Sequence, residues 1–137
     1  MIRLRRPTFY WPDDHYAAQM GLTMKKLYDR GITMQMGAHG NMMGLGAHWE
    51  MELFTHGSFS NYDAIEIATI NGFKHHGLDH ILGSVEPGKL ADFVIMQKNP
   101  LENIRNTRTI EYVVKNGVVY SGKDASRVFP NPMPSQK

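Results

Sequence analysis

The sequence contains no cysteine, so disulfide bonds and thiolate chemistry are excluded, and cysteine usage indicates no redox compartment. No hydrophobic run approaches the roughly 20 residues that a transmembrane helix requires, so we expect no membrane partner. The formal net charge is only +2 and the basic residues are scattered, which does not favour a nucleic-acid partner. Arg3, Arg5 and Arg6 do cluster, but three arginines at a terminus are more often a solvated end than a binding patch.

The chain has 137 residues, the length of one domain, and 42% of them are hydrophobic, which is enough to build a core. The ten methionines are expected to fill irregular space in that core. The charged start, Met1 to Pro7, is not followed by an apolar segment and does not resemble a secretory signal. The sequence indicates no compartment.

Residues 1–80 are predicted to be a helix-rich α/β region. Apolar side chains at helical spacing and cap residues predict three helices, over residues 14–30, over 47–55 and from Ser60 towards His76. The pair Asn71-Gly72 is expected to weaken or interrupt the third helix. The only clear strand covers residues 32–36 and ends at Gly37. Because one strand leaves its backbone groups unpaired, this region indicates a fragment or a chain that pairs with another.

Residues 81–122 are predicted to be mainly β, with a buried strand over 91–96 and a short helical turn over 101–106. The pair Asn116-Gly117 lies between two β-prone runs, which is a strong hairpin signal. The proline-containing residues 123–137 are expected to be a loose tail.

A glycine-rich loop follows the first strand and reads Gly37-Ala38-His39-Gly40-Asn41, continuing through Gly44-Leu45-Gly46-Ala47-His48-Trp49-Glu50. Glycine lets the backbone approach a ligand closely, and histidine titrates or binds metal near neutral pH. α/β proteins usually place their chemistry at the carboxyl end of a strand. This loop is therefore the candidate functional site.

Three segments carry a family resemblance that covers about Gly31 to Tyr120. They are residues 82–95 (LGSVEPGKLADFVI), residues 112–120 (YVVKNGVVY) and the helix that ends in Ala68-Thr69-Ile70-Asn71. Together they resemble the C-terminal part of the amidohydrolase superfamily of metal-dependent hydrolases. The resemblance implies an α/β fold, namely the last helix-strand-helix units of a (β/α) TIM-like barrel followed by strands of a small β-sandwich.

The sequence departs from the family pattern in two ways. The family's early His-x-His pair is absent from this chain, so most of the metal ligands are missing. Most members also hold an Asp after the last barrel strand, where this chain reads Gly37-Ala38-His39. A subgroup of amidohydrolase-like proteins shares Gly-Ala-His-Gly, and the chain resembles that subgroup.

His39 is the candidate catalytic residue, with a tentative role as a metal ligand. A neutral imidazole binds zinc or accepts a proton from water, but it does not supply the negative charge of an Asp. A lone histidine after a strand is otherwise often structural. His48 is a candidate for substrate binding or loop ordering, and Asn41 for a hydrogen bond within the loop. The resemblance implies a divalent metal, expected to be zinc, in the complete protein.

Other polar groups favour plainer interpretations. His48, Glu52 and His56 share one helix face, which is more often a solvated face than a ligand pair. The histidines at positions 75, 76 and 80 flank a glycine and are not expected to bind metal. Glu86, Lys89 and Asp92 are expected to set a turn and the start of a strand.

The function favoured by the resemblance is that of a C-terminal fragment of a metal-dependent amidohydrolase. Such an enzyme uses metal-activated water to hydrolyse C–N bonds, non-peptide amide or related, in a small-molecule or peptide-like substrate. The chain alone is expected to be inactive. The alternatives are a non-catalytic interaction or structural module, and half of a split enzyme completed by an N-terminal barrel partner chain. Assembly into a homo-oligomer is a further alternative.

Overall fold

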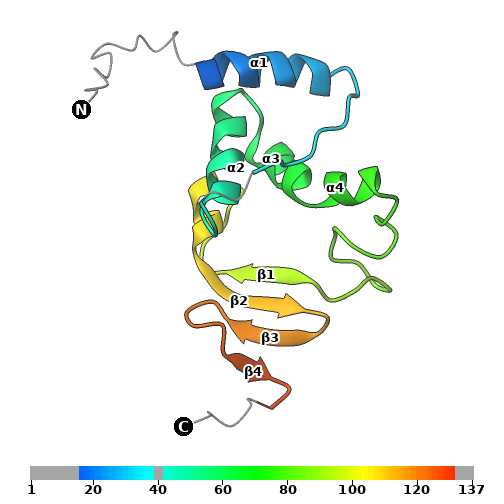
Figure 1. The fold of residues 1–137 in the computed structure, drawn as a ribbon, viewed down its shortest axis with the longest axis vertical. Coiled ribbons are helices and arrows are strands. Elements are labelled where there is room, and N and C mark those ends of the chain that lie inside the picture. Colours follow the sequence, from blue (N-terminus) through cyan, green and yellow to red (C-terminus); the bar gives the residue numbers. More distant parts are fainter. Residues whose placement is uncertain (1–15, 39–41, 132–137) are drawn as a thin grey trace, which may run out of the picture.

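The computed structural model describes residues 16–38 and 42–131, which form a helical part joined to a small sheet (Figure 1). The helical part holds α1 (Tyr16–Tyr28), α2 (Gly46–His56), α3 (Asn61–Ala68) and α4 (Ile70–His75). A 3-10 helix, η2 (Ile104–Arg108), packs against α2 and leads into the sheet. Within these ranges no helix has the length and apolar character needed to cross a membrane.

The start of α3 is determined by a reciprocal cap. The amide of Asp63 donates to Ser60 Oγ at 3.0 Å, and the amide of Ser60 donates to Asp63 Oδ2 at 2.9 Å. The expected interruption of this helix occurs at Thr69, whose φ of −129° and ψ of −98° are not helical. The break therefore lies before Asn71-Gly72, and Asn71 itself is a buried member of α4.

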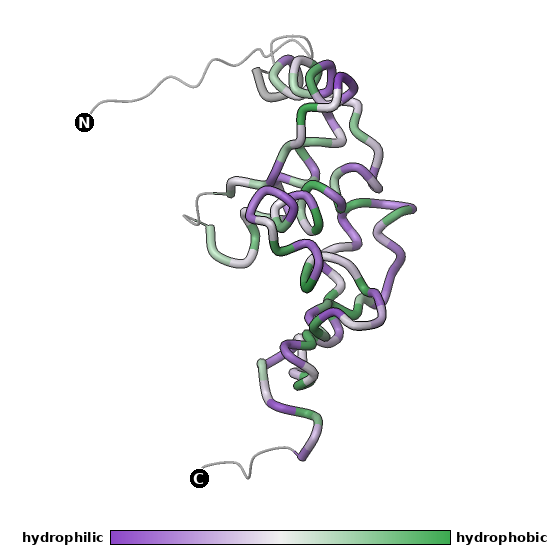
Figure 2. The backbone as a smooth tube through the Cα atoms, turned by 90° about the vertical axis from the view of Figure 1, so that its right-hand side faces the viewer, coloured by the Kyte–Doolittle hydropathy of each residue, from purple (hydrophilic) through white to green (hydrophobic). Residues whose placement is uncertain are grey.

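The hydrophobic core is organised around α2, which contacts α1, α3 and η2. Its buried members come from α2, the loop after it, α3 and η2, and are Met51, Phe54, Phe59, Ala64, Ile67 and Ile104. The rings of Phe54 and Phe59 pack edge to face, with centroids 5.2 Å apart. Because Ile104 belongs to η2, the core joins the helical part to the segment before β2. Hydrophobic residues occur along both the helical part and the sheet (Figure 2).

The sheet is antiparallel, with the order β1-β2-β3-β4, and it extends away from the helices in that order (Figure 1). Its strands are β1 (Phe93–Met96), β2 (Ile110–Lys115), β3 (Val118–Ser121) and β4 (Arg127–Phe129). The predicted hairpin is confirmed, since Asn116 and Gly117 both have positive φ angles, 49° and 77°.

The acidic and basic residues before β1 have the structural role that the sequence predicted. Lys89 Nζ donates to Glu86 Oε1 at 3.3 Å within the turn. Asp92 accepts hydrogen bonds from Lys115 and from the amide of Asn116, which join the start of β1 to the hairpin turn. These contacts explain the presence of Glu86, Lys89 and Asp92 by structure alone, and none of the three needs a catalytic role.

The expectation of a loose tail from residue 123 is wrong at residues 127–129. These residues form β4 and pair with β3, Val119 opposite Phe129 and Tyr120 opposite Arg127. A turn closed by the amide of Ala125 bonding to Ser121 O, at 2.9 Å, brings the chain back. The tail's prolines lie after this strand, at and beyond position 130, so they do not prevent its pairing. Residues 132–137 lie outside the described residues.

The strand predicted over residues 32–36 is not a strand in the structure. From Thr33 to Met36 the side chains alternate as a strand's would: Met34 and Met36 are half-buried against the core, and Thr33 and Gln35 are exposed. Ile32, on the same face as Met34, is 50% exposed. A strand exists only when a neighbour pairs with its backbone, and the described part of the chain supplies no neighbour there. The predicted strand is therefore wrong for the described residues, because composition favours a strand but does not supply its pairing partner.

Candidate functional site

The glycine-rich loop connects the segment over residues 32–36 to α2. The candidate residues His39 and Asn41 lie outside the described residues, so their roles remain predictions. The described second half of the loop turns at Gly44, which has φ 77°, and the amide of Gly46 donates to Met42 O at 2.8 Å. Its two ends meet, because a Cβ built on Gly46 would lie 3.6 Å from Ala38 Cβ.

The first residue of the loop is bonded to α2 through a side chain. The amide of Gly37 donates to Glu50 Oε1 at 2.9 Å. Sequence reasoning gave Glu50 no role, because nothing local links a carboxylate to an amide 13 residues earlier. The only sequence signal for Glu50 is its place as the acidic residue that ends the glycine-rich motif.

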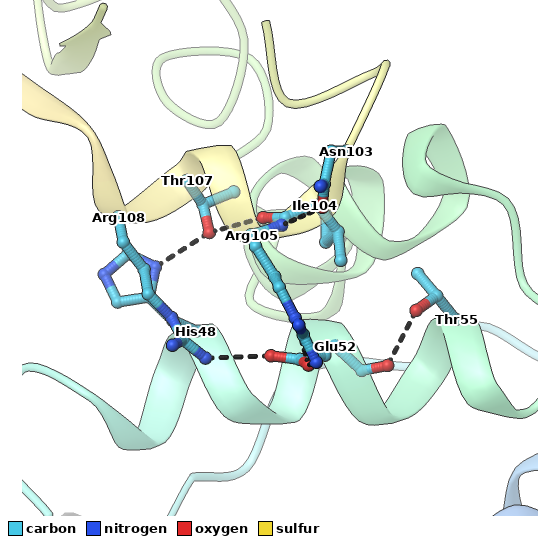
Figure 3. A network of polar contacts seen from close by, with 8 residues as sticks. All are labelled: His48, Glu52, Thr55, Asn103, Ile104, Arg105, Thr107 and Arg108. Carbon is cyan, nitrogen blue, oxygen red and sulfur yellow. Dashed lines mark hydrogen bonds and ion pairs between the residues drawn. The ribbon is translucent and has the colours of Figure 1, made fainter. Parts of the chain in front are cut away.

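His48 forms its described hydrogen bond with η2 (Figure 3). His48 Nδ1 lies 3.0 Å from Thr107 Oγ1, and the Thr107 hydroxyl donates to Ile104 O at 2.8 Å. Since that donation uses the single hydroxyl proton, His48 must donate from Nδ1. This assigns the neutral tautomer with a hydrogen on Nδ1 and leaves Nε2 as the ring's acceptor.

Burial lowers the pKa of His48, and the positive charge of Arg108 lowers it further. The imidazole is therefore neutral near neutral pH, which matches its tautomer. The hydrogen bond joins α2 to the segment leading into β2, 59 residues away. The expected role of His48 in substrate binding or loop ordering remains a prediction.

A pH-dependent stability follows from this shift. As pH falls below the usual His48 pKa of 6.5, the unfolded chain binds a proton that the folded chain does not bind at that position. Stability from His48 is thus complete above that pH and is lost as pH falls towards the lowered pKa. In urea unfolding, the wild-type chain should lose more stability between neutral and mildly acidic pH than His48→Gln, which cannot titrate. Equal losses would contradict this account of His48.

Glu52 corrects the interpretation of this helix face as solvated. Its side chain is only 14% exposed and pairs with two arginines of η2 (Figure 3). Arg105 Nε donates to Glu52 Oε1 at 2.6 Å, and Arg108 Nη2 donates to Glu52 Oε2 at 2.8 Å. The hydrogen bond from Arg105 lowers the pKa of Glu52, so the carboxylate stays ionised. The third member of the face, His56, is exposed.

A groove of about 490 Å³ lies beside this network, lined by Trp49, Glu52, Leu53, His56, Arg105 and Arg108. The Glu52 carboxylate of the groove accepts hydrogen bonds from the guanidinium groups of both Arg105 and Arg108. The groove therefore lies between α2 and η2, and its carboxylate and guanidinium groups hold the two helices together.

Comparison with known proteins identifies the family. The amidohydrolase family model matches residues 13–120, so the chain belongs to the amidohydrolase family. It is 40% identical over 72 residues to a guanine deaminase of Escherichia coli K12 and 47% identical over 62 residues to an adenine deaminase of Desulforamulus reducens. These alignments cover 51% and 44% of this chain.

Solved structures agree. A Xaa-Pro dipeptidase with bound methionine in the active site shows 30% identity and a TM-score of 0.67 over 76% of this chain. Phenylurea hydrolase B shows 37% identity and a TM-score of 0.54 over 56%. Structural neighbours of this kind are amidohydrolase TIM-barrel proteins. The chain spans only 26% and 17% of these two structures, and 16% and 10% of the two deaminases.

Members of this family are generally metal-dependent. Residues 16–38 and 42–131 contain no group of three histidine, aspartate or glutamate side chains placed to hold one ion. His75 and His76 pack ring against ring, 5.4 Å apart, without such a third ligand. These residues do not fit a metal centre by themselves.

Proposed function

We propose that this chain is the C-terminal part of a metal-dependent amidohydrolase that hydrolyses C–N bonds, non-peptide amide or related. The substrate is a small molecule or a peptide-like compound. The family match supports the reaction class, and the named relatives are deaminases, a dipeptidase and a phenylurea hydrolase. The short span of each relative that the chain covers supports its being a part.

The observation that carries this proposal is the segment over residues 32–36. From Thr33 to Met36 its side chains alternate between core and solvent as in a strand, and no described strand pairs with it. In the proposal this segment is the last strand of a barrel, and its neighbours belong to the complete protein. Exposed apolar side chains agree with a larger assembly, notably Ile32 (50%) at the first position of this segment and Met43 (91%) in the loop.

The glycine-rich loop then lies at the carboxyl end of the last barrel strand, where this class of fold places its chemistry. His39 is the proposed catalytic residue, accepting or returning a proton during hydrolysis, and it is a candidate metal ligand. Its loop resembles the Gly-Ala-His-Gly subgroup. The remaining ligands, for a metal expected to be zinc, would come from other parts of the complete protein. Alone, the chain is expected to be inactive.

Two alternatives rest on the same exposed apolar side chains. The chain could act as a non-catalytic interaction module, or as half of a split enzyme with an N-terminal barrel partner chain. Sequencing the DNA upstream of Met1 separates them from the main proposal. We expect an in-frame barrel segment with a His-x-His pair. A stop codon and an unrelated gene directly ahead of Met1 would instead support the alternatives.

A further inference from the structure

Glu50 has an unusual environment for a helix carboxylate. One oxygen, Oε1, accepts the hydrogen bond from the Gly37 amide at 2.9 Å. The other, Oε2, is shielded from solvent and has no hydrogen-bond partner among the described residues. Burying an unpaired carboxylate oxygen is unfavourable for folding, so such a group in a native protein requires an explanation.

The helix that carries Glu50 is firmly held. Met51 and Phe54 bury one face of α2 in the core, and His48 and Glu52 bond another to η2. Gly37, in contrast, is exposed. Its amide donates to Glu50 and to no backbone carbonyl of the described residues. The Glu50 carboxylate therefore connects the first residue of the glycine-rich loop to a rigid support at the loop's other end.

We propose that Glu50 is a positioning residue: it fixes the start of the glycine-rich loop relative to α2 and thereby sets the placement of the loop's chemistry. This role deepens the proposed function, on which its catalytic consequence rests. The hydrogen bond needs an acceptor at the distance that a glutamate side chain reaches. Glutamine preserves that acceptor, aspartate is one methylene shorter, and alanine removes it.

Amide hydrogen exchange of the 15N-labelled 137-residue chain tests the contact directly. In Glu50→Ala the Gly37 amide should exchange on the order of tenfold faster, because its acceptor is gone, and in Glu50→Gln it should stay close to wild type. Glu66→Ala is the matched control, since Glu66 is a half-buried helix carboxylate that bonds Tyr28 instead. Should Glu50→Ala not fold, Glu50→Asp replaces it, with faster exchange expected. Unchanged Gly37 exchange in the folded variant would overturn the proposal.

Kinetics of the complete protein supply the second readout. Misplacing a reacting group lowers turnover, so Glu50→Ala should lower kcat by about tenfold or more with a smaller change in KM, and Glu50→Gln should restore most of it. Faster Gly37 exchange with no hydrolysis by the wild-type protein would reject the proposed function and keep the loop contact. Faster exchange with unchanged kcat in Glu50→Ala would overturn the positioning role.

Discussion

Replacing His39 by alanine in the complete protein is expected to lower kcat by about 10²–10⁴-fold, the range typical of losing a positioned general acid or base. The reason is the location of His39 in the glycine-rich loop that follows the proposed last barrel strand. Alanine has neither a titrating nitrogen nor a metal-binding one. The measurement is steady-state release of ammonia or amine from C–N substrates, beginning with purines because the curated relatives include guanine and adenine deaminases.

The pH profile separates a chemical role for His39 from a structural one. If His39 accepts a proton, the wild-type protein should lose kcat/KM as the imidazole becomes protonated, and His39→Ala should lack that limb. His80→Ala is the matched control, because His80 is exposed in the segment after α4 and has no role in the proposed site. Unchanged turnover in His39→Ala would show that this histidine is structural.

Much of the fold could be predicted from the sequence because the signals are local. Ser60 and Asp63 are three positions apart, and together they form the cap that starts α3. Asn116 and Gly117 adopt the positive φ angles that a tight hairpin requires. Each of these features depends on residues within one turn of the chain.

The features that sequence reasoning missed depend on partners far away in the chain. β4 exists because β3 offers an edge, and a proline-rich tail gives no sign of that pairing. The segment over residues 32–36 has the composition of a strand, but pairing is decided by neighbours that the described residues do not include.

The candidate site shows the same division. Histidine and glycine mark the loop in the sequence, and the family resemblance gives them a position. The contacts that hold α2 come from Thr107, Arg105 and Arg108, more than 50 residues later, as the separations of 59, 53 and 56 positions show. Glu50 reaches back 13 positions to Gly37. These pairings arise from tertiary packing, which composition and spacing do not reveal.

We propose that the chain provides one side of a metal-dependent active site, because it belongs to the amidohydrolase family and its described residues hold an incomplete ligand set. A second large effect follows for metal content. In residues 16–38 and 42–131 no three ligand side chains gather around a common point, and His39 would be at most one ligand of several. A structural or catalytic zinc site takes at least three protein ligands, so the chain alone should bind zinc weakly.

Metal analysis of two purified proteins tests this account most directly. The proteins are the 137-residue chain and the product of the longer reading frame expected upstream, each dialysed against the same zinc-containing buffer. The account predicts at least one tightly bound metal ion per complete protein and well under one per 137-residue chain. Near-stoichiometric, tightly bound zinc in the short chain, or none in the complete protein, would contradict it.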